Sequence, residues 1–184
     1  MILLIDNYDS FSFNLYQFIG TINSDIKVIK NDELTVEEIK KLNPSHIILS
    51  PGPGRPKDSG IIEDVVKNIH DIPILGVCLG HQAICESYGL DIINSKKICH
   101  GKSDIVRIDN NSLLFKGLKS EIAVARYHSL IGSGKCDELK VTALNSDNEI
   151  MAVEHVKYPI YGLQFHPESI LTECGMDILR NFLK

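Results

Sequence analysis

The sequence lacks several features that would assign it to a specialised class of protein. Its five cysteines are an odd number without CxxC spacing, which argues against a disulfide framework and against a four-cysteine zinc site. No apolar run approaches the roughly 20 residues that a membrane span needs. The apolar run after Met1 is too short for a secretory leader and follows no basic residues, so we expect reduced thiols and a cytoplasmic location.

No charge of one sign dominates, because 19 lysines and arginines stand against 24 acidic residues and leave a net charge of −5. The basic residues form no cluster, so the sequence does not indicate nucleic-acid binding. A hydrophobic content of 43% and a charged content of 23% are typical of a globular protein rather than a disordered one. The 184 residues fit one domain that spans 1–184.

In the first half of the chain, short apolar runs alternate with helical patterns. Strands are predicted at 2–6, 26–29, 46–50 and 73–77. Helices are predicted at 10–20, 35–42, 61–69 and 79–89. The first helix is expected to start at Asp9 or Ser10 as N-cap and to stop at Gly20, and Thr35 and Glu38 form a capping box for the second. This alternation predicts a parallel sheet with helices on both faces.

From about residue 91 the pattern changes to strand-like segments separated by turns. They are SDIVRID (103–109), EIAVARY (121–127), LKVTAL (139–144), EIMAVEH (149–155) and PIYGLQF (159–165), with a last helix over 175–183. The expected fold is therefore α/β: an open, mostly parallel, twisted sheet with helices on both faces and a strand-rich C-terminal half.

The stretch GVCLG places a cysteine where a predicted strand meets a predicted helix. Ligands of open parallel sheets bind outside the carboxyl ends of the strands, which is where Cys78 lies. The pattern G-x-C-x-G matches a nucleophile elbow with cysteine in place of serine, and Gly76 and Gly80 allow the sharp turn. Free N–H groups at the start of the helix would stabilise a thiolate there. Cys78 is therefore the candidate nucleophile.

A nucleophile of this kind needs a base, and the base needs an orienting group. His166 follows an apolar strand in the stretch FHPES, with Glu168 two residues later. His166 could take the thiol proton, and Glu168 could bind the other ring nitrogen and hold the useful tautomer. The stretch HPE alone would be weak evidence for a catalytic histidine. Together with GVCLGHQ it predicts a Cys78–His166–Glu168 triad.

Acyl transfer also needs N–H donors for a developing oxyanion. The stretch SPGPG follows a predicted strand at the same sheet edge, and its prolines have no N–H, so Gly52 and Gly54 carry the free donors. The N–H of Leu79, directly after the nucleophile, is the expected second donor. On its own, PGPG is more often simply a rigid turn.

The stretches SPGPG, GVCLGHQ and GLQFHPE, in this order and spacing, resemble the class I (triad) glutamine amidotransferases over essentially the whole chain. The resemblance implies that Cys78 forms a γ-glutamyl thioester with glutamine and releases ammonia, with His166 as base and acid and Glu168 orienting it. It also implies a glutamine pocket formed by Gly52, Pro53, Gly54, Leu79, Gln82, Ser129 and Leu130. No catalytic role falls to His81.

Within that family, IDNYDSFSFN, HGKSD and ARYHSL resemble the glutaminase subunits of anthranilate synthase and of aminodeoxychorismate synthase. We favour anthranilate synthase, an enzyme of tryptophan biosynthesis. Aminodeoxychorismate synthase, an enzyme of folate biosynthesis, is the alternative, and some members of the family serve both synthases. The GMP synthetase glutaminases typically have a GGP-type loop in place of PGPG.

The resemblance implies a heteromer, because no site for chorismate is visible in this chain. A chorismate-binding partner subunit would supply that site and its Mg²⁺, while this chain would need no metal or other cofactor. The loops at Asn7–Phe11 and His100–Ser103 are candidates for the contact. The alternatives are a stand-alone γ-glutamyl or thiol hydrolase, for which the same triad would serve, and an inactive binding module.

Overall fold

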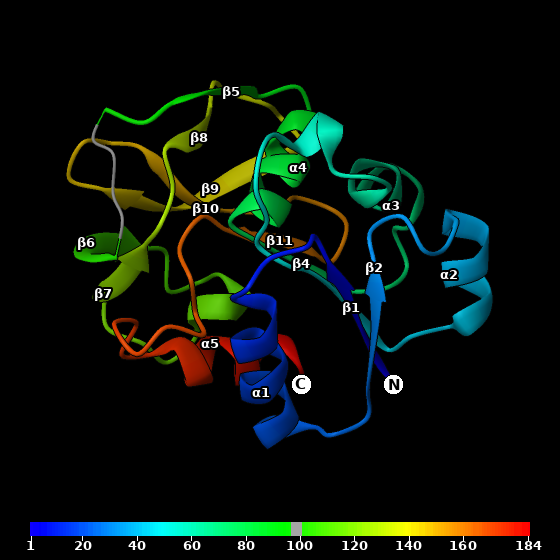
Figure 1. Cartoon of the computed structure of the whole chain (residues 1–184). Helices are drawn as coiled ribbons and strands as arrows, with labels where there is room; N and C mark the ends of the chain where they lie inside the picture. The colour runs from blue at the N-terminus through cyan, green and yellow to red at the C-terminus, as the bar shows by residue number, and fades with distance from the viewer. Residues whose placement is uncertain (97–100) are drawn as a thin grey trace.

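A nine-stranded sheet forms the centre of the computed structural model, which describes residues 1–96 and 101–184 (Figure 1). Cys99 and His100, the latter part of a predicted contact loop, lie outside the described residues. The strands follow the order β2-β1-β3-β4-β11-β10-β9-β6-β7 across this sheet. Its first five strands pair in parallel and its other strands in antiparallel fashion.

The parallel part of the sheet comes from the segments in which strands and helices alternate. Its strands are β2 (Ile26–Lys30), β1 (Ile2–Asp6), β3 (His46–Leu49), β4 (Ile74–Val77) and β11 (Ile160–Leu163). The predicted bounds of β1, β2, β3 and β4 agree with the observed bounds within a residue or two at each end. β11 joins beside β4 from far along the chain, so that Gly162 pairs with Gly76. The carboxyl ends of β4 and β11 therefore meet at one sheet edge.

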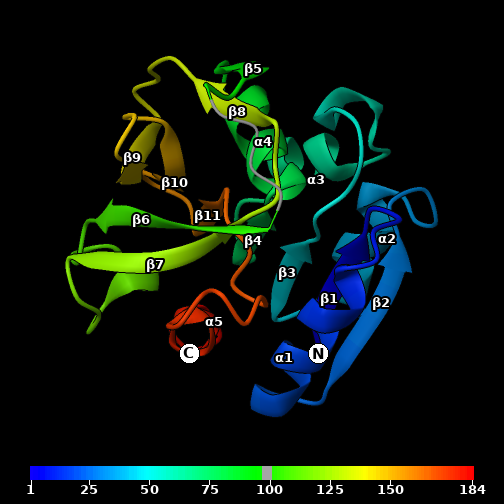
Figure 2. The same ribbon diagram turned by 60° about the vertical axis from the view of Figure 1, so that its left-hand side comes forward.

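The antiparallel part confirms the predicted strand-rich C-terminal half (Figure 2). Its strands are β10 (Ile150–His155), β9 (Leu139–Asn145), β6 (Lys102–Ile108) and β7 (Glu121–Arg126). A separate two-stranded sheet of β5 (Asp91–Asn94) and β8 (Leu130–Ser133) was not predicted. Both strands are only four residues long, too short to show a clear alternating pattern.

Helices cover both faces of the sheet, as the sequence predicted (Figure 1). One face packs on α1 (Ser12–Ile22) and α5 (Gly175–Phe182). The other packs on α2 (Val36–Leu42), α3 (Ile62–Asn68) and α4 (Leu79–Ser87), and short 3-10 turns lie at Pro56–Asp58 and Leu113–Phe115. Side chains along β1 alternate between the two cores, because Ile2 and Leu4 face one and Leu3 and Ile5 face the other. Within 1–96 and 101–184, no helix is long and apolar enough to cross a membrane.

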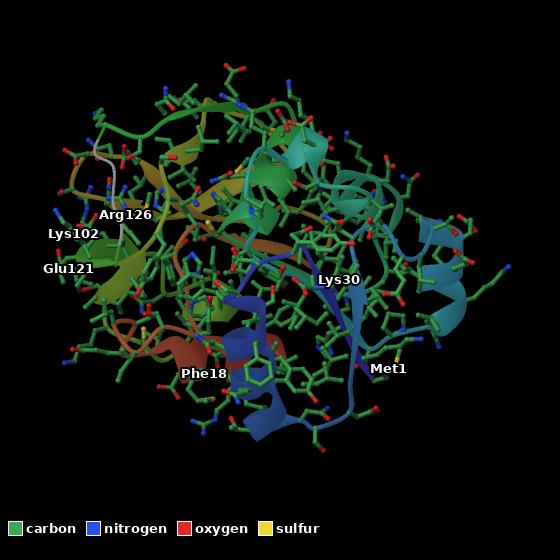
Figure 3. The ribbon with its side chains drawn as sticks, viewed as in Figure 1. Met1, Phe18, Lys30, Lys102, Glu121 and Arg126 are labelled. Carbon is green, nitrogen blue, oxygen red and sulfur yellow. The ribbon has the colours of Figure 1, made fainter. Side chains whose placement is uncertain are left out.

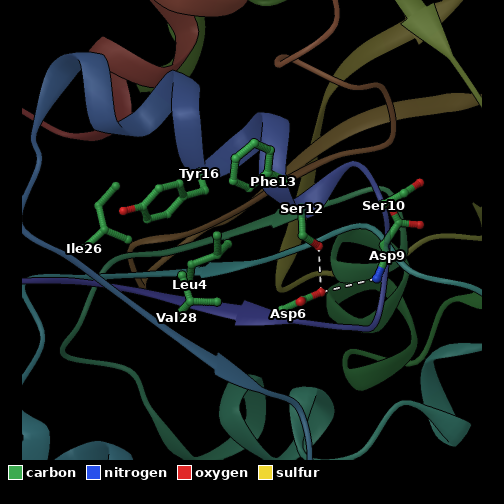
Figure 4. A pocket seen from close by; sticks show the side chains of 9 residues that line it. All are labelled: Leu4, Asp6, Asp9, Ser10, Ser12, Phe13, Tyr16, Ile26 and Val28. Carbon is green, nitrogen blue, oxygen red and sulfur yellow. Dashed lines mark hydrogen bonds between the residues drawn. The ribbon is translucent and has the colours of Figure 1, made fainter.

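The start of α1 differs from the prediction, because neither Asp9 nor Ser10 is its N-cap. The cap position is Phe11, and the Asp9 carboxylate accepts a hydrogen bond from the Phe11 N–H at 2.7 Å. Asp6, at the end of β1, accepts bonds from the Asp9 N–H and the Ser12 hydroxyl, as Figure 4 shows. A carboxylate from the preceding strand thus organises this turn, which local capping patterns do not reveal.

Two further helix signals gave opposite outcomes. The capping box of Thr35 and Glu38 is confirmed, with hydrogen bonds in both directions. Gly20 was expected to end α1, but it lies inside the helix, which continues to Ile22. A glycine inside a helix weakens it without ending it when tertiary packing supports the next turn.

Candidate active site

Cys78 occupies a strained turn between β4 and α4. Its φ of 53° and ψ of −99° are uncommon for a residue with a side chain, as expected of a nucleophile elbow. Its N–H donates to the Leu163 carbonyl at 2.8 Å, which ties the turn to β11. A Cβ on Gly76 would overlap the Gly80 carbonyl, so the glycines at these positions let α4 approach the sheet.

His166 and Glu168 lie together in the turn after β11. The ring Nδ1 lies 2.7 Å from Glu168 Oε1, and both residues are buried. The His166 main chain is fixed on both sides, because its N–H donates to Ala125 and its carbonyl accepts from the Thr172 hydroxyl. Since a carboxylate only accepts, the proton between the pair lies on Nδ1 and leaves Nε2 for the thiol.

The charge state of His166 depends on its two neighbours. Burial lowers the pKa of His166, but its interactions with Cys78 and Glu168 outweigh burial and raise that pKa to about 10. The Nε2 atom is buried and has no partner of good hydrogen-bond geometry among the residues that the structure describes. It is therefore available to the thiol, and the arrangement favours a protonated imidazole beside the sulfur at neutral pH.

Two aromatic rings hold the imidazole from its sides. Phe11 and Tyr127 pack edge-on against His166, with ring centroids at 5.4 Å and 5.1 Å. The two aromatic rings also contact each other at 5.1 Å. Phe11 comes from the turn before α1 and Tyr127 directly follows β7, so two distant segments fix the ring orientation. Sequence reasoning gave neither residue a role in the site.

Of the two glycines in the SPGPG loop, Gly52 lies against Leu79, the residue after Cys78, whereas a Cβ on Gly54 would meet nothing within 4 Å. A Cβ on Gly52 would lie 2.5 Å from the Leu79 side chain and 2.6 Å from Asn7, so this loop packs directly on the start of α4. Asn7 clamps the loop, because its main-chain and side-chain N–H groups donate to Ser50. Pro53 and Gly54 are exposed, which leaves their main chain open to a ligand.

Two of the predicted glutamine-binding residues, Gln82 and Leu130, contact each other. The Gln82 side chain on α4 donates to the Leu130 carbonyl at 2.9 Å. Ser129 is exposed, while its carbonyl accepts from the Ser95 N–H at 2.8 Å. Residues 48 positions apart along the chain thus meet beside the elbow.

Gln164 is a site residue that sequence reasoning missed. It is fully buried, and its Nε2 donates to the Cys78 sulfur at 3.8 Å. Its Oε1 accepts from Gln82 at 3.2 Å, so Gln164 joins the nucleophile to the predicted glutamine pocket. The available signal was a single amide within the apolar run IYGLQF, two residues before His166.

His81 has the packing role that was expected of it. It is fully buried, and a Cβ on Gly162 would lie 2.6 Å from its ring. Burial is the main cause that lowers the pKa of His81, to about 3, so the ring is neutral. A neutral, enclosed ring of this kind supports the packing between α4 and β11.

A surface cleft of about 460 Å³ lies beside the turn before α1 (Figure 4). Side chains from this turn, from α1 and from β1 and β2 line it, including Asp9, Phe13, Tyr16 and Val28. The Phe13 side chain is 63% exposed. None of Cys78, His166 and Glu168 lines this cleft, so it is separate from the candidate triad.

Comparison with known proteins gives a consistent result. The family model for class I glutamine amidotransferases matches residues 3–184. The chain is 51% identical to anthranilate synthase component 2 of Cyanophora paradoxa, over all of this chain and 98% of that protein. It is 43% identical to the aminodeoxychorismate/anthranilate synthase component 2 of Bacillus subtilis, over all of this chain and 96% of that one.

Two further similarities bear on length and fold. The chain is 47% identical over 99% of its length to the bifunctional protein TrpGD of Thermotoga maritima, but it spans only 32% of that protein. A crystal structure described as a GMP synthase component from Thermoplasma acidophilum superposes with a TM-score of 0.89. The two sequences are 27% identical, and the match covers 99% of this chain and 91% of the other.

Proposed function

Because the chain belongs to the class I glutamine amidotransferases, we propose that it is the glutaminase component of an anthranilate synthase in tryptophan biosynthesis. The observation that carries the proposal is the buried His166–Glu168 pair, whose free ring nitrogen is available to the thiol on the strained Cys78 turn. The relatives named anthranilate synthase component 2 support the choice of synthase. A cytoplasmic location is part of the same proposal.

In the proposed reaction, the Cys78 sulfur attacks the side-chain amide carbon of glutamine. In the attacking state, His166 Nε2 holds the thiol proton, and Glu168 stabilises the imidazolium. The N–H groups of Leu79 and Gly52 would stabilise the negative charge on the former amide oxygen. The carbon–nitrogen bond then breaks, and the departing nitrogen takes the proton from His166.

Ammonia leaves, and a γ-glutamyl thioester remains on Cys78. A water molecule, deprotonated by His166, attacks that thioester, and glutamate departs as the thiol is restored. The Ser129–Leu130 main chain would hold the α-amino and α-carboxylate groups of glutamine, and the Gln82 side chain would also bind the substrate. The exposed Pro53–Gly54 main chain would line the same pocket.

The ammonia would pass to a chorismate-binding partner subunit, which would aminate chorismate and eliminate pyruvate. That partner would hold the Mg²⁺, and this chain would contribute no cofactor. The Asn7–Phe11 turn is the contact we favour, because Phe11 touches His166 while the neighbouring Tyr8 is 57% exposed. Contact there would link docking of the partner to the catalytic ring.

The decisive experiment is co-purification with each candidate chorismate-binding subunit, followed by identification of the product. We expect glutamine-dependent formation of anthranilate with release of pyruvate. Aminodeoxychorismate without pyruvate release would instead assign the folate-pathway role, and the Bacillus subtilis relative carries both names. Rapid glutamine turnover without any partner would favour a stand-alone hydrolase.

Replacement of the nucleophile tests the chemistry. We expect Cys78→Ser to lower glutamine-dependent synthesis by at least about a thousandfold, because the hydroxyl is a far weaker nucleophile here. Added ammonium salt should still support synthesis by the complex. The matched control is Cys136→Ser, a half-buried thiol outside the site, which should keep full activity. Glutamine-dependent activity in Cys78→Ser would remove Cys78 from the mechanism.

A further inference from the structure

The His128 ring makes two hydrogen bonds that fix where its proton lies. The side chain is 4% exposed, and its Nε2 lies 3.1 Å from Arg126 Nε. Its Nδ1 lies 2.9 Å from the Leu130 carbonyl oxygen. An arginine nitrogen can only donate, so Nε2 must accept, and the ring proton must lie on Nδ1. Nδ1 therefore donates to Leu130, and the ring is neutral in a single tautomer.

Arg126 cannot easily leave this arrangement. Its side chain is 1% exposed and forms ion pairs with Asp104 at 2.5 Å and Glu149 at 2.9 Å. Arg126 lies on β7 opposite Lys102 of β6, and both residues are labelled in Figure 3. Burial first, and then the Arg126 charge, lower the pKa of His128 to about 4. His128 therefore stays neutral at physiological pH.

The acceptor of the His128 bond belongs to the predicted glutamine pocket. The Leu130 carbonyl also accepts from Gln82 Nε2 at 2.9 Å, so two donors from separate elements use the same oxygen. With both donors in place, the peptide that follows Leu130 has a fixed orientation. The main chain of Ser129 and Leu130 is held with it, before any substrate arrives.

We propose that His128, held in one tautomer by Arg126, is a positioning residue that sets the Ser129–Leu130 main chain for the α-amino and α-carboxylate groups of glutamine. This inference rests on the proposed glutaminase function. His128 itself touches neither the sulfur nor the reacting amide. Its loss should therefore weaken glutamine binding and leave the chemical step nearly unchanged.

Two substitutions separate the two ring nitrogens. In His128→Asn, the side-chain nitrogen can lie near the position of Nδ1 and keep the donor to Leu130. In His128→Gln, the longer side chain reaches the position of Nε2, so it keeps an acceptor for Arg126 but loses the donor. We expect the Gln variant to raise KM for glutamine about three- to tenfold at nearly constant kcat, as the loss of one hydrogen bond implies. The Asn variant should stay close to the wild-type KM.

Controls make the outcome specific. His70→Gln changes a histidine that stacks on Tyr158 away from the site, and it should leave KM unchanged. Ammonium-dependent synthesis should be equal in all variants. Equal KM values in the wild-type, Asn and Gln proteins would overturn the positioning role while the glutaminase function stands. If the wild-type chain turned over no glutamine with any partner, the proposed function would fail and this role with it.

A measurement independent of activity tests the same assignment. Nitrogen-15 NMR of the wild-type protein should show His128 as the neutral Nδ1–H tautomer from pH 5 to 8. A ring that titrates within that range, or one that carries its proton on Nε2, would contradict the hydrogen-bond pattern. This test still applies if either variant fails to fold.

Discussion

At the scale of single residues, the site is organised by which groups can donate a proton and which can only accept one. Glu168 must accept from His166, and Arg126 must donate to His128, so two rings in the same region carry different charges. Interaction with a thiol and a carboxylate raises the pKa of His166 to about 10, whereas burial beside a guanidinium lowers that of His128 to about 4. The surroundings of each ring, rather than the residue type, decide its charge.

Replacing Glu168 tests the orienting role at this scale. Glu168→Gln keeps an oxygen that can accept from Nδ1 but removes the negative charge, so the pKa of His166 should fall from about 10 toward its usual range. Because the active form pairs a thiolate with the imidazolium, the alkaline limb of the pH–rate profile should move to lower pH. We expect kcat for glutamine hydrolysis to fall about a hundredfold or more.

The pH dependence of kcat/KM in the wild-type and variant complexes measures both effects. Glu173→Gln is the control, because it removes an exposed carboxylate near the same turn and should leave the profile unchanged. An unshifted alkaline limb in Glu168→Gln would show that Glu168 does not set the charge of His166.

At the scale of elements, close approach between backbones places the candidate catalytic groups. α4 begins directly against β4 and β3 because Gly76 and Gly80 have no Cβ, and an added Cβ on Gly80 would lie 2.5 Å from the Leu49 carbonyl. A Cβ on Gly175, at the start of α5, would likewise overlap the Pro167 carbonyl of the catalytic turn. These contacts hold the Cys78 turn close to the sheet and the start of α5 close to the turn that carries His166 and Glu168.

A pair of glycine substitutions tests this account. In Gly76→Ala the new Cβ would overlap the Gly80 main chain, so we expect the free energy of unfolding to fall by about 1–3 kcal/mol. Gly20→Ala adds a Cβ inside α1 that meets only Ile26 at 3.9 Å, and should stabilise by about 0.5–1 kcal/mol. Urea unfolding measures both changes, and a neutral Gly76→Ala would contradict the close approach.

At the scale of the whole molecule, the nine-stranded sheet combines a parallel half that bears Cys78 with an antiparallel half that supplies Arg126, His128 and Tyr127. The candidate triad residues follow β4 and β11, where the two halves meet, because β11 pairs with β4 on one side and β10 on the other. Three buried histidines lie around this boundary: His81 on α4, His128 after β7 and His166 after β11.

These histidines predict a stability maximum near neutral pH. His81 and His128 have lowered pKa values in the folded state, so the unfolded chain binds more protons below about pH 6.5 and stability falls on acidification. His166 has a raised pKa, so its contribution is complete below about pH 6.5 and is lost as pH rises toward 10. Each group changes the free energy of unfolding by about 1.4 kcal/mol per pH unit within its window.

Thermal unfolding between pH 4 and 10 measures this profile. His128→Asn should flatten the acid limb, and His166→Asn should flatten the alkaline limb. A stability curve that keeps rising from pH 7 to 9 in the wild-type protein would contradict the assigned charge of His166.

The sequence by itself determined the features that depend on neighbouring residues. The strand and helix order of the first half, the Thr35 capping box and the turn around Cys78 all follow from short-range periodicity, capping and the absence of Cβ atoms. The candidate triad followed from the same local patterns. The structure then brought His166 and Glu168 to 2.7 Å of each other, within a span of three residues.

Only the tertiary structure decided the features that join distant segments. Gln164 reaches the Cys78 sulfur across 86 positions, and Arg126 joins Glu149 across 23. The start of α1 at Ser12 depends on Asp6 of the preceding strand, and the Phe11 and Tyr127 contacts with His166 depend on how α1 and β7 pack. Local sequence patterns predict hydrogen bonds within a turn or a helix. The contacts between distant segments form only when the strands pair and the helices pack.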